Sequence, residues 1–193
     1  MFLRTFAWAA CVIYASVPSF WLLIHPHAAY WRTRRQAGLP VYQFLVPLWI
    51  AMWIALGALS WPFRKILLYD TNRAWFPAAA LIALGIYLYA RGRHGFSPFQ
   101  LSGHAELDPA RHQQTLVVAG IRRRVRHPIY LGHVCEMLGW SVGTGLAVLY
   151  ALTAFALISG AFMVRLEDAE LEERFGEQYR RYQKEVPAIF PRL

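Results

Sequence analysis

The sequence predicts an all-α fold: a polytopic membrane helix bundle with about five transmembrane segments, followed by a C-terminal amphipathic helix. Of the 193 residues, 57% are hydrophobic and 16% are charged, whereas a soluble domain carries roughly 25% charged residues. The apolar residues also gather in long runs, and a hydrocarbon core about 30 Å thick needs roughly 20 such residues in a helix. We therefore predict an integral, multi-pass membrane protein with the lipid bilayer as its solvent.

Five apolar segments approach this length, and each is expected to form a helix. They comprise residues 2–24, 41–61, 75–90, 128–142 and 146–164. The last two belong to one apolar run that, as a single helix rising 1.5 Å per residue, would be about 55 Å long. Because Gly143-Thr144-Gly145 in its middle favours a turn, we predict a helical hairpin whose first arm is short for a complete crossing.

The distribution of basic residues predicts the orientation of these segments. With the N-terminus outside, the loops 25–40, 91–127 and 165–193 are cytoplasmic and hold 16 of the 20 Lys and Arg residues. Basic residues concentrate in cytoplasmic loops, so we predict an outside N-terminus and a cytoplasmic C-terminus. The net charge of +9 then reflects attraction to an anionic leaflet. Nucleic-acid binding is not expected, because the Arg residues stand between apolar runs.

Two parts are expected along the chain. Residues 1–90 hold the N-terminal transmembrane segments, and residues 91–193 hold a cytoplasmic loop, the helical hairpin and the C-terminal amphipathic helix. The apolar face of that last helix recurs at helical spacing and consists of Leu171, Phe175, Tyr179 and Tyr182. We expect this helix to lie against the cytoplasmic ends of the bundle and to end before Pro187, because proline lacks a backbone donor.

Polar residues near the membrane edge are candidates for a functional site. Pro128 suits the first turn of a helix and leaves His127 at its N-terminus, an end that favours anionic groups. A basic membrane-interface cap with an aromatic anchor also explains this pair, and the pair alone does not favour a functional site over such a cap. Arg165 and Glu167 lie where the last span meets the tail and can approach a ligand wedged between helices. Taken alone, these two residues are better explained by an ordinary interfacial charge cluster.

Other polar residues lie inside the fourth segment. His133 and Glu136 are one helical turn apart, and ionisable residues at membrane depth usually have a partner or a function; packing and function explain this pair equally well. Small residues let helices approach closely, and those expected to do so are Gly132, Gly139 and Gly143. Cys11 and Cys135 provide neither a disulfide framework nor zinc spacing, so no metal site is predicted.

The C-terminal residues together resemble a known family. The resemblance begins at Gln114-Thr115-Leu116-Val117, passes Gly120 and reaches Arg126-His127-Pro128-Ile129-Tyr130-Leu131-Gly132. It resumes at Glu167-Asp168, Leu171, Phe175-Gly176, Tyr179, Tyr182, Val186-Pro187 and Pro191. In this order and spacing the chain is similar to the isoprenylcysteine carboxyl methyltransferase family, including its smaller prokaryotic relatives and the related phospholipid methyltransferases. The first three segments match only as hydrophobic spans.

The resemblance implies a membrane methyltransferase that uses S-adenosyl-L-methionine (SAM). The cofactor contacts that it implies are Gln114, Thr115, Leu116, Val117, His127, Pro128, Ile129, Tyr130 and Glu167. It also implies catalytic roles for two residues: Glu167 would hold the cationic end of the donor, and Arg165 would orient the acceptor. The acceptor is expected to be a lipophilic or small molecule with a carboxylate, thiol or amine. Two positions depart from the family: Arg122 replaces a common Tyr, and Met163 replaces an acceptor-orienting Arg.

Two other functions stay open on the sequence alone. A sterol-reductase-like enzyme would bind NADPH, helped by the basic run Arg122 to Arg124. A non-catalytic membrane scaffold would bind neither cofactor and would tolerate replacement of His127, Glu136 and Glu167.

Overall fold

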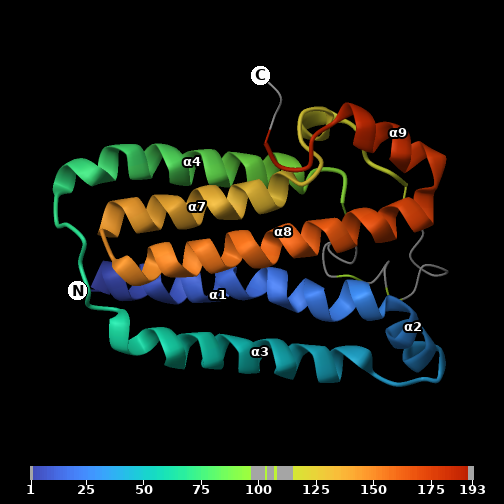
Figure 1. Cartoon of the computed structure of the whole chain (residues 1–193), viewed down its shortest axis with the longest axis horizontal. Helices are drawn as coiled ribbons and strands as arrows, with labels where there is room; N and C mark the ends of the chain where they lie inside the picture. Colours follow the sequence, from blue (N-terminus) through green and yellow to red (C-terminus); the bar gives the residue numbers. More distant parts are fainter. Residues whose placement is uncertain (1, 97–102, 104–106, 108–114, 191–193) are drawn as a thin grey trace.

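The computed structural model describes residues 2–96, 103, 107 and 115–190. These residues form a bundle of long helices (Figure 1). The helices are α1 (Phe2–Ile24), α2 (Ala28–Gln36), α3 (Val41–Ser60), α4 (Trp75–Gly92), α7 (Pro128–Thr144), α8 (Ala147–Phe175) and α9 (Glu177–Glu185). Short 3₁₀ turns occupy His25–His27, Trp61–Phe63, Asn72–Ala74 and Gly120–Arg123. Within the described chain, the only strand-like pairing is an isolated bridge between Leu67 and Leu146, and the predicted all-α class is confirmed.

The long helices lie in a row. From one edge to the other, α3 packs on α1, α1 on α8, α8 on α7, and α7 on α4 (Figure 1). The helices α2 and α9 lie at the end of the bundle away from the N-terminus. The turn after α1 and the segment after α8 therefore lie at the same end of the bundle. The predicted orientation requires this arrangement, because it places the basic segments 25–40 and 165–193 on one side of the membrane.

Four helical segments of the described chain are long and apolar enough to cross a membrane, and they are Phe2–Gln36, Val41–Phe63, Asn72–Gly92 and Ala147–Phe175. The fifth predicted segment is α7, which has 17 residues and is therefore about 26 Å long. It is the short first arm of the predicted hairpin. Five full crossings thus stay a prediction, whereas four segments meet the criteria of length and composition.

Glycines bring α7 close to α4. A Cβ atom added to Gly85 would lie 2.7 Å from the carbonyl oxygen of Gly132, and one added to Gly132 would lie 2.9 Å from the carbonyl oxygen of Gly85. A Cβ atom on Gly139 would lie 3.0 Å from the carbonyl oxygen of Ala78, and one on Gly143 would meet the ring of Trp75. Side chains at these positions would force the helices apart, so the close approach predicted for Gly132, Gly139 and Gly143 is confirmed.

The predicted hairpin turn is also present. Gly145 follows α7 with a φ of 65°, a left-handed conformation that glycine adopts without steric cost. Its N–H donates to the carbonyl of Ser141, and its own carbonyl accepts from the N–H of Leu68 at 2.8 Å. The loop between α3 and α4 thereby supports the turn between α7 and α8.

The polar residues inside α7 have partners on other helices. The hydroxyl of Tyr14 on α1 donates to Glu136 Oε2 at 2.6 Å. The ring of His133 stacks on Tyr14, with centroids 4.9 Å apart, and on Tyr89 of α4 at 5.6 Å. These contacts connect three helices at depth, where an unpaired polar group would be costly.

The expected tail helix is divided in two. Helix α8 continues to Phe175, Gly176 turns the chain with a φ of 57°, and α9 follows. The predicted apolar face nevertheless closes into one cluster, in which Tyr179, Tyr182 and Val186 are buried and three other side chains pack against them: Leu116, Leu171 and Phe175. The tail therefore folds back over the end of the bundle.

Candidate functional site

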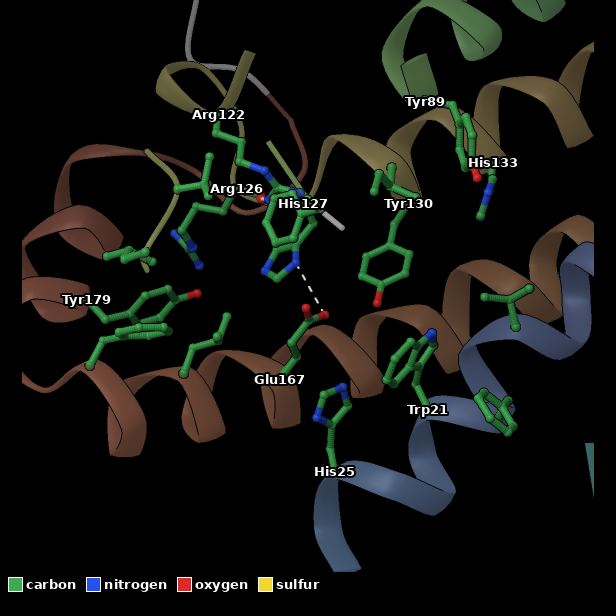
Figure 2. A pocket seen from close by; sticks show the side chains of 18 of the residues that line it. Trp21, His25, Tyr89, Arg122, Arg126, His127, Tyr130, His133, Glu167 and Tyr179 are labelled. Carbon is green, nitrogen blue, oxygen red and sulfur yellow. Dashed lines mark hydrogen bonds and ion pairs between the residues drawn. The ribbon is translucent and has the colours of Figure 1, made fainter. Parts of the chain in front are cut away.

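A cavity of about 470 Å³ lies beside the start of α7, between α1, α8 and the tail (Figure 2). One part of its wall is charged and includes Arg122, Arg126, His127 and Glu167. Another part is apolar and aromatic and comes from α1 and α3, with Val17, Phe20, Tyr42, Val46 and Trp49. The cavity thus has room for a ligand with a polar and an apolar portion.

The charged wall centres on His127. This residue caps α7, and Pro128 occupies the first helical position, as the sequence predicts. His127 Nε2 lies 2.9 Å from Asp168 Oδ1, and His127 Nδ1 lies 3.4 Å from Glu167 Oε2. Burial acts to lower the pKa of His127, but the two carboxylates outweigh it and raise that pKa to about 9. The imidazole is therefore a cation at neutral pH.

A buried network holds His127 in place through Asp168. Arg126 Nη2 lies 2.5 Å from Asp168 Oδ2, and the hydroxyl of Tyr179 on α9 donates to Asp168 Oδ1. Burial and the neighbouring Asp168 carboxylate raise the pKa of Tyr179 far above its ordinary value, so the phenol stays protonated. Arg126 also donates through Nη1 to the carbonyls of Gln183 and Val186. Every charge in the network has a partner, which is the condition for stable burial.

The backbone of the tail completes this wall. The N–H of Arg126 donates to the carbonyl of Pro187, and the N–H of His127 donates to the carbonyl of Ala188, both at 2.9 Å. The hydroxyl of Tyr182 donates to the carbonyl of Arg122 at 2.6 Å. The His-Pro corner is therefore fixed from outside by the chain that follows α9.

The structure gathers most of the predicted cofactor contacts. Those that line the cavity are Thr115, Leu116, Val117, His127, Ile129, Tyr130 and Glu167. Pro128 is buried beneath it against Gly92. Arg165 is exposed on α8 and is not part of the lining. Gln114 lies outside the described residues.

The N-terminal half supplies lining residues that the sequence did not point to. Trp21 and His25 face Glu167 from the end of α1 and the turn after it (Figure 2). The sequence interpretation placed the site within residues 91–193, because the family resemblance is confined to that part. The His25-Pro26-His27 sequence was the available signal, since it repeats the His-Pro pair of the fourth segment.

Atoms without a hydrogen bond indicate which residues can hold a ligand. Glu167 Oε2 and Arg122 Nε are buried atoms that form no hydrogen bond with the residues described, although Glu167 Oε2 keeps its ion pair with His127 Nδ1 at 3.4 Å. Buried polar atoms are normally hydrogen-bonded, so a carboxylate and a guanidinium facing the cavity can bind a ligand with opposite charges. No group of three metal-binding side chains occurs among the described residues.

The long apolar helices define an integral membrane protein, and the charged cavity lies at one end of its helix bundle. The model of the phospholipid methyltransferase family matches residues 74–178, more than half of the chain. The chain belongs to this family. The matched part begins just before α4, contains all of α7 and α8, and includes His127 and Glu167.

Three relatives illustrate the range of similar proteins. A protein-S-isoprenylcysteine O-methyltransferase of Rattus norvegicus is 29% identical over 153 residues, covering 74% of this chain and 49% of that protein. A methanethiol S-methyltransferase of Pseudomonas deceptionensis is 38% identical over 69 residues, covering 36% and 26%. A Delta(14)-sterol reductase of Mus musculus is 28% identical over 153 residues, covering 69% and 36%. The chain thus spans half or less of the length of these relatives. No solved structure matches it.

Proposed function

We propose that the chain is a membrane methyltransferase that transfers the methyl group of SAM to an acceptor bound in the same cavity. The observation that carries this proposal is the Glu167 carboxylate, whose buried Oε2 atom has no hydrogen bond within the described chain beyond its ion pair with His127, in a cavity of the family-matched region. Methyltransferase relatives support the same activity.

The charged wall fits the donor. SAM supplies a methyl group activated by a sulfonium centre, together with an amino-acid end that carries both charges. Glu167 is placed to accept from an ammonium group or to face a cationic centre, and Arg122 offers an unpaired Nε to a carboxylate. We assign the remaining donor contacts to Thr115, Leu116, Val117, His127, Ile129 and Tyr130. Pro128 would shape the corner from beneath.

The apolar wall fits a lipophilic or small acceptor. Phe20 and Trp49 line it, together with Val46 of α3, which is 42% exposed. We propose that an acceptor enters from the lipid between α1 and α3, the two helices that supply this wall. The rat and bacterial relatives are named for an isoprenylcysteine and for methanethiol, which are a lipophilic and a small acceptor.

Methyl transfer between such ligands depends mainly on alignment. Two reactants held in line react as one molecule, which supplies much of the rate enhancement. Glu167 would act directly on the donor. The predicted acceptor-orienting role of Arg165 stays a prediction, and an Arg165→Ala variant tests it through the KM for the acceptor.

The orientation in the membrane follows the basic loops. We propose that the cavity faces the cytoplasm, with the N-terminus outside. A cysteine introduced as Lys65→Cys should then react with a membrane-impermeant maleimide on intact cells, whereas Glu185→Cys should react only after permeabilisation. The reverse pattern would overturn the orientation.

Calorimetry in detergent tests the proposed activity. The wild-type protein should bind SAM, and Glu167→Gln should weaken binding roughly 10- to 100-fold, because a charge-assisted hydrogen bond is lost. Glu172→Gln is the matched control, since Glu172 pairs with Arg180 at the surface of α8, and it should bind as the wild type does. A folded wild-type protein that does not bind SAM would contradict the proposal.

The mouse sterol reductase similarity supports a second candidate, an NADPH-dependent reductase. A ligand that binds only the folded protein stabilises it by an amount that grows with the ratio of ligand concentration to Kd. SAM should therefore raise the melting temperature of the wild type, and NADPH at the same concentration should not. A shift with NADPH alone would favour the reductase.

A further inference from the structure

His25 occupies the side of the cavity opposite His127. It belongs to the turn that follows α1, and only 7% of its surface is exposed. The indole of Trp21 stacks on its ring, with centroids 5.3 Å apart and an interplanar angle of 22°. Figure 2 shows the ring directed into the cavity toward Glu167. The ring is therefore held in a defined position by an aromatic contact.

The imidazole is nevertheless unpaired. Neither Nδ1 nor Nε2 makes a hydrogen bond with any residue that the structure describes. A buried polar group without a partner costs free energy, and a histidine serving only to pack would be replaced by an apolar ring at no loss. The geometry instead leaves one ring nitrogen free to accept and the other free to donate within the cavity.

The charges around His25 select among acceptors. Glu167 faces it from α8, and this carboxylate would repel an acceptor carboxylate placed between the two residues. The other basic groups of the wall already have partners: Arg126 pairs with Asp168, His127 with Asp168 and Glu167, and Arg122 is assigned through its Nε to the donor carboxylate. His25 has no such partner among the described residues, and a neutral imidazole suits a neutral nucleophile that carries a proton.

We propose that His25 is the acceptor-side catalytic residue and that the acceptor is a thiol; this rests on the proposed methyltransferase function. The unprotonated ring nitrogen accepts the S–H proton while the acceptor sulfur forms its bond to the methyl carbon. The carbon–sulfur bond of the donor breaks, and its electron pair stays on the donor sulfur, which becomes a neutral thioether. The imidazolium then releases its proton to water.

A variant pair separates this role from packing. His25→Phe keeps an aromatic ring against Trp21 and removes both nitrogens, and His27→Phe changes an exposed neighbour. The assays are methylation of 1-octanethiol and of N-acetyl-S-farnesylcysteine, SAM binding by calorimetry, and thermal unfolding. We expect His25→Phe to lower kcat/KM for octanethiol at least about tenfold, with SAM affinity and melting temperature unchanged. His27→Phe should match the wild type throughout.

The outcomes distinguish the two levels of the proposal. A wild type that binds no SAM overturns the methyltransferase function. A wild type that binds SAM but methylates only the farnesylcysteine carboxylate, or neither probe, overturns the thiol assignment alone. Unchanged octanethiol kinetics in His25→Phe overturns the role of His25, and so does a lowered melting temperature that accounts for the lost activity.

Discussion

His127 Nε2 lies 2.9 Å from Asp168 Oδ1, joining the first turn of α7 to α8. The same carboxylate accepts from Arg126 and Tyr179, so one side chain connects two helices of the bundle with α9. The catalytic candidate Glu167 is the preceding residue and reaches His127 at its other nitrogen. Asp168 therefore holds His127 in place at the cavity wall, although Asp168 itself is not part of the cavity lining.

Removing the charge of Asp168 should destabilise the fold. Asp168→Asn leaves Arg126 and His127 as buried cations without their shared anion, and breaking a buried pair costs roughly 3–5 kcal/mol. Chemical unfolding in mixed micelles measures the change. Glu172→Gln, which breaks the exposed pair with Arg180, should cost about 1 kcal/mol or less. Equal effects of the two substitutions would contradict the network.

The stability of the protein should fall as the pH rises through the pKa of His127. That pKa is raised from 6.5 to about 9 by the facing carboxylates, so the folded state keeps a proton that the unfolded state has released. The contribution is complete below about pH 6.5 and is lost between there and about pH 9, for a total of roughly 3 kcal/mol. His127→Gln should remove this decline. A decline of the same size in that variant would assign it to other groups.

The close contact between α4 and α7 should not tolerate replacement of a glycine by alanine. Gly85→Ala places a Cβ atom 2.7 Å from the backbone carbonyl of Gly132, and overpacking of this kind costs about 1–3 kcal/mol. Gly160→Ala on α8 is the control, because its Cβ atom would lie 3.8 Å from Pro18, an ordinary contact. Thermal unfolding in one detergent compares them. The prediction fails if both variants have the same melting temperature as the wild type.

The hydrogen bond between Tyr14 and Glu136 should also contribute to stability. Tyr14→Phe removes the donor and leaves a carboxylate oxygen in the bundle without it, at a cost of about 1–3 kcal/mol. Tyr87→Phe removes a hydroxyl from a half-exposed ring on α4 and should have little effect. A similar loss in both variants would show that the ring, and not the hydrogen bond, matters.

The sequence predicted those features that depend on local pattern. The bounds 2–24 of the first segment agree with α1, and Gly145 forms the expected turn. The His127-Pro128 pair marks the start of α7, because proline is favoured in the first helical turn. Glu167 lines the cavity, as expected, and Arg165 does not. Helical periodicity explains this difference, since residues two apart point to different sides of a helix.

Features that depend on distant contacts could not be predicted in this way. Tyr14 and Glu136 are separated by 122 positions, and no spacing rule connects them. His25 was not selected, because a histidine near the end of a span is ordinary until its neighbours are known. The tail divides at Gly176, whose φ of 57° suits a glycine, whereas the apolar spacing across this glycine had predicted one continuous helix.

The two backbone hydrogen bonds from Arg126 and His127 to Pro187 and Ala188 have a consequence for biosynthesis. A ribosome makes the His-Pro pair about sixty residues before it makes the carbonyls that hold it, at a rate of about 5–20 residues per second. During those seconds the membrane spans can already be inserted while the corner between them is still unformed. A nascent chain arrested before Pro187 would then be a membrane-inserted protein without a finished ligand site.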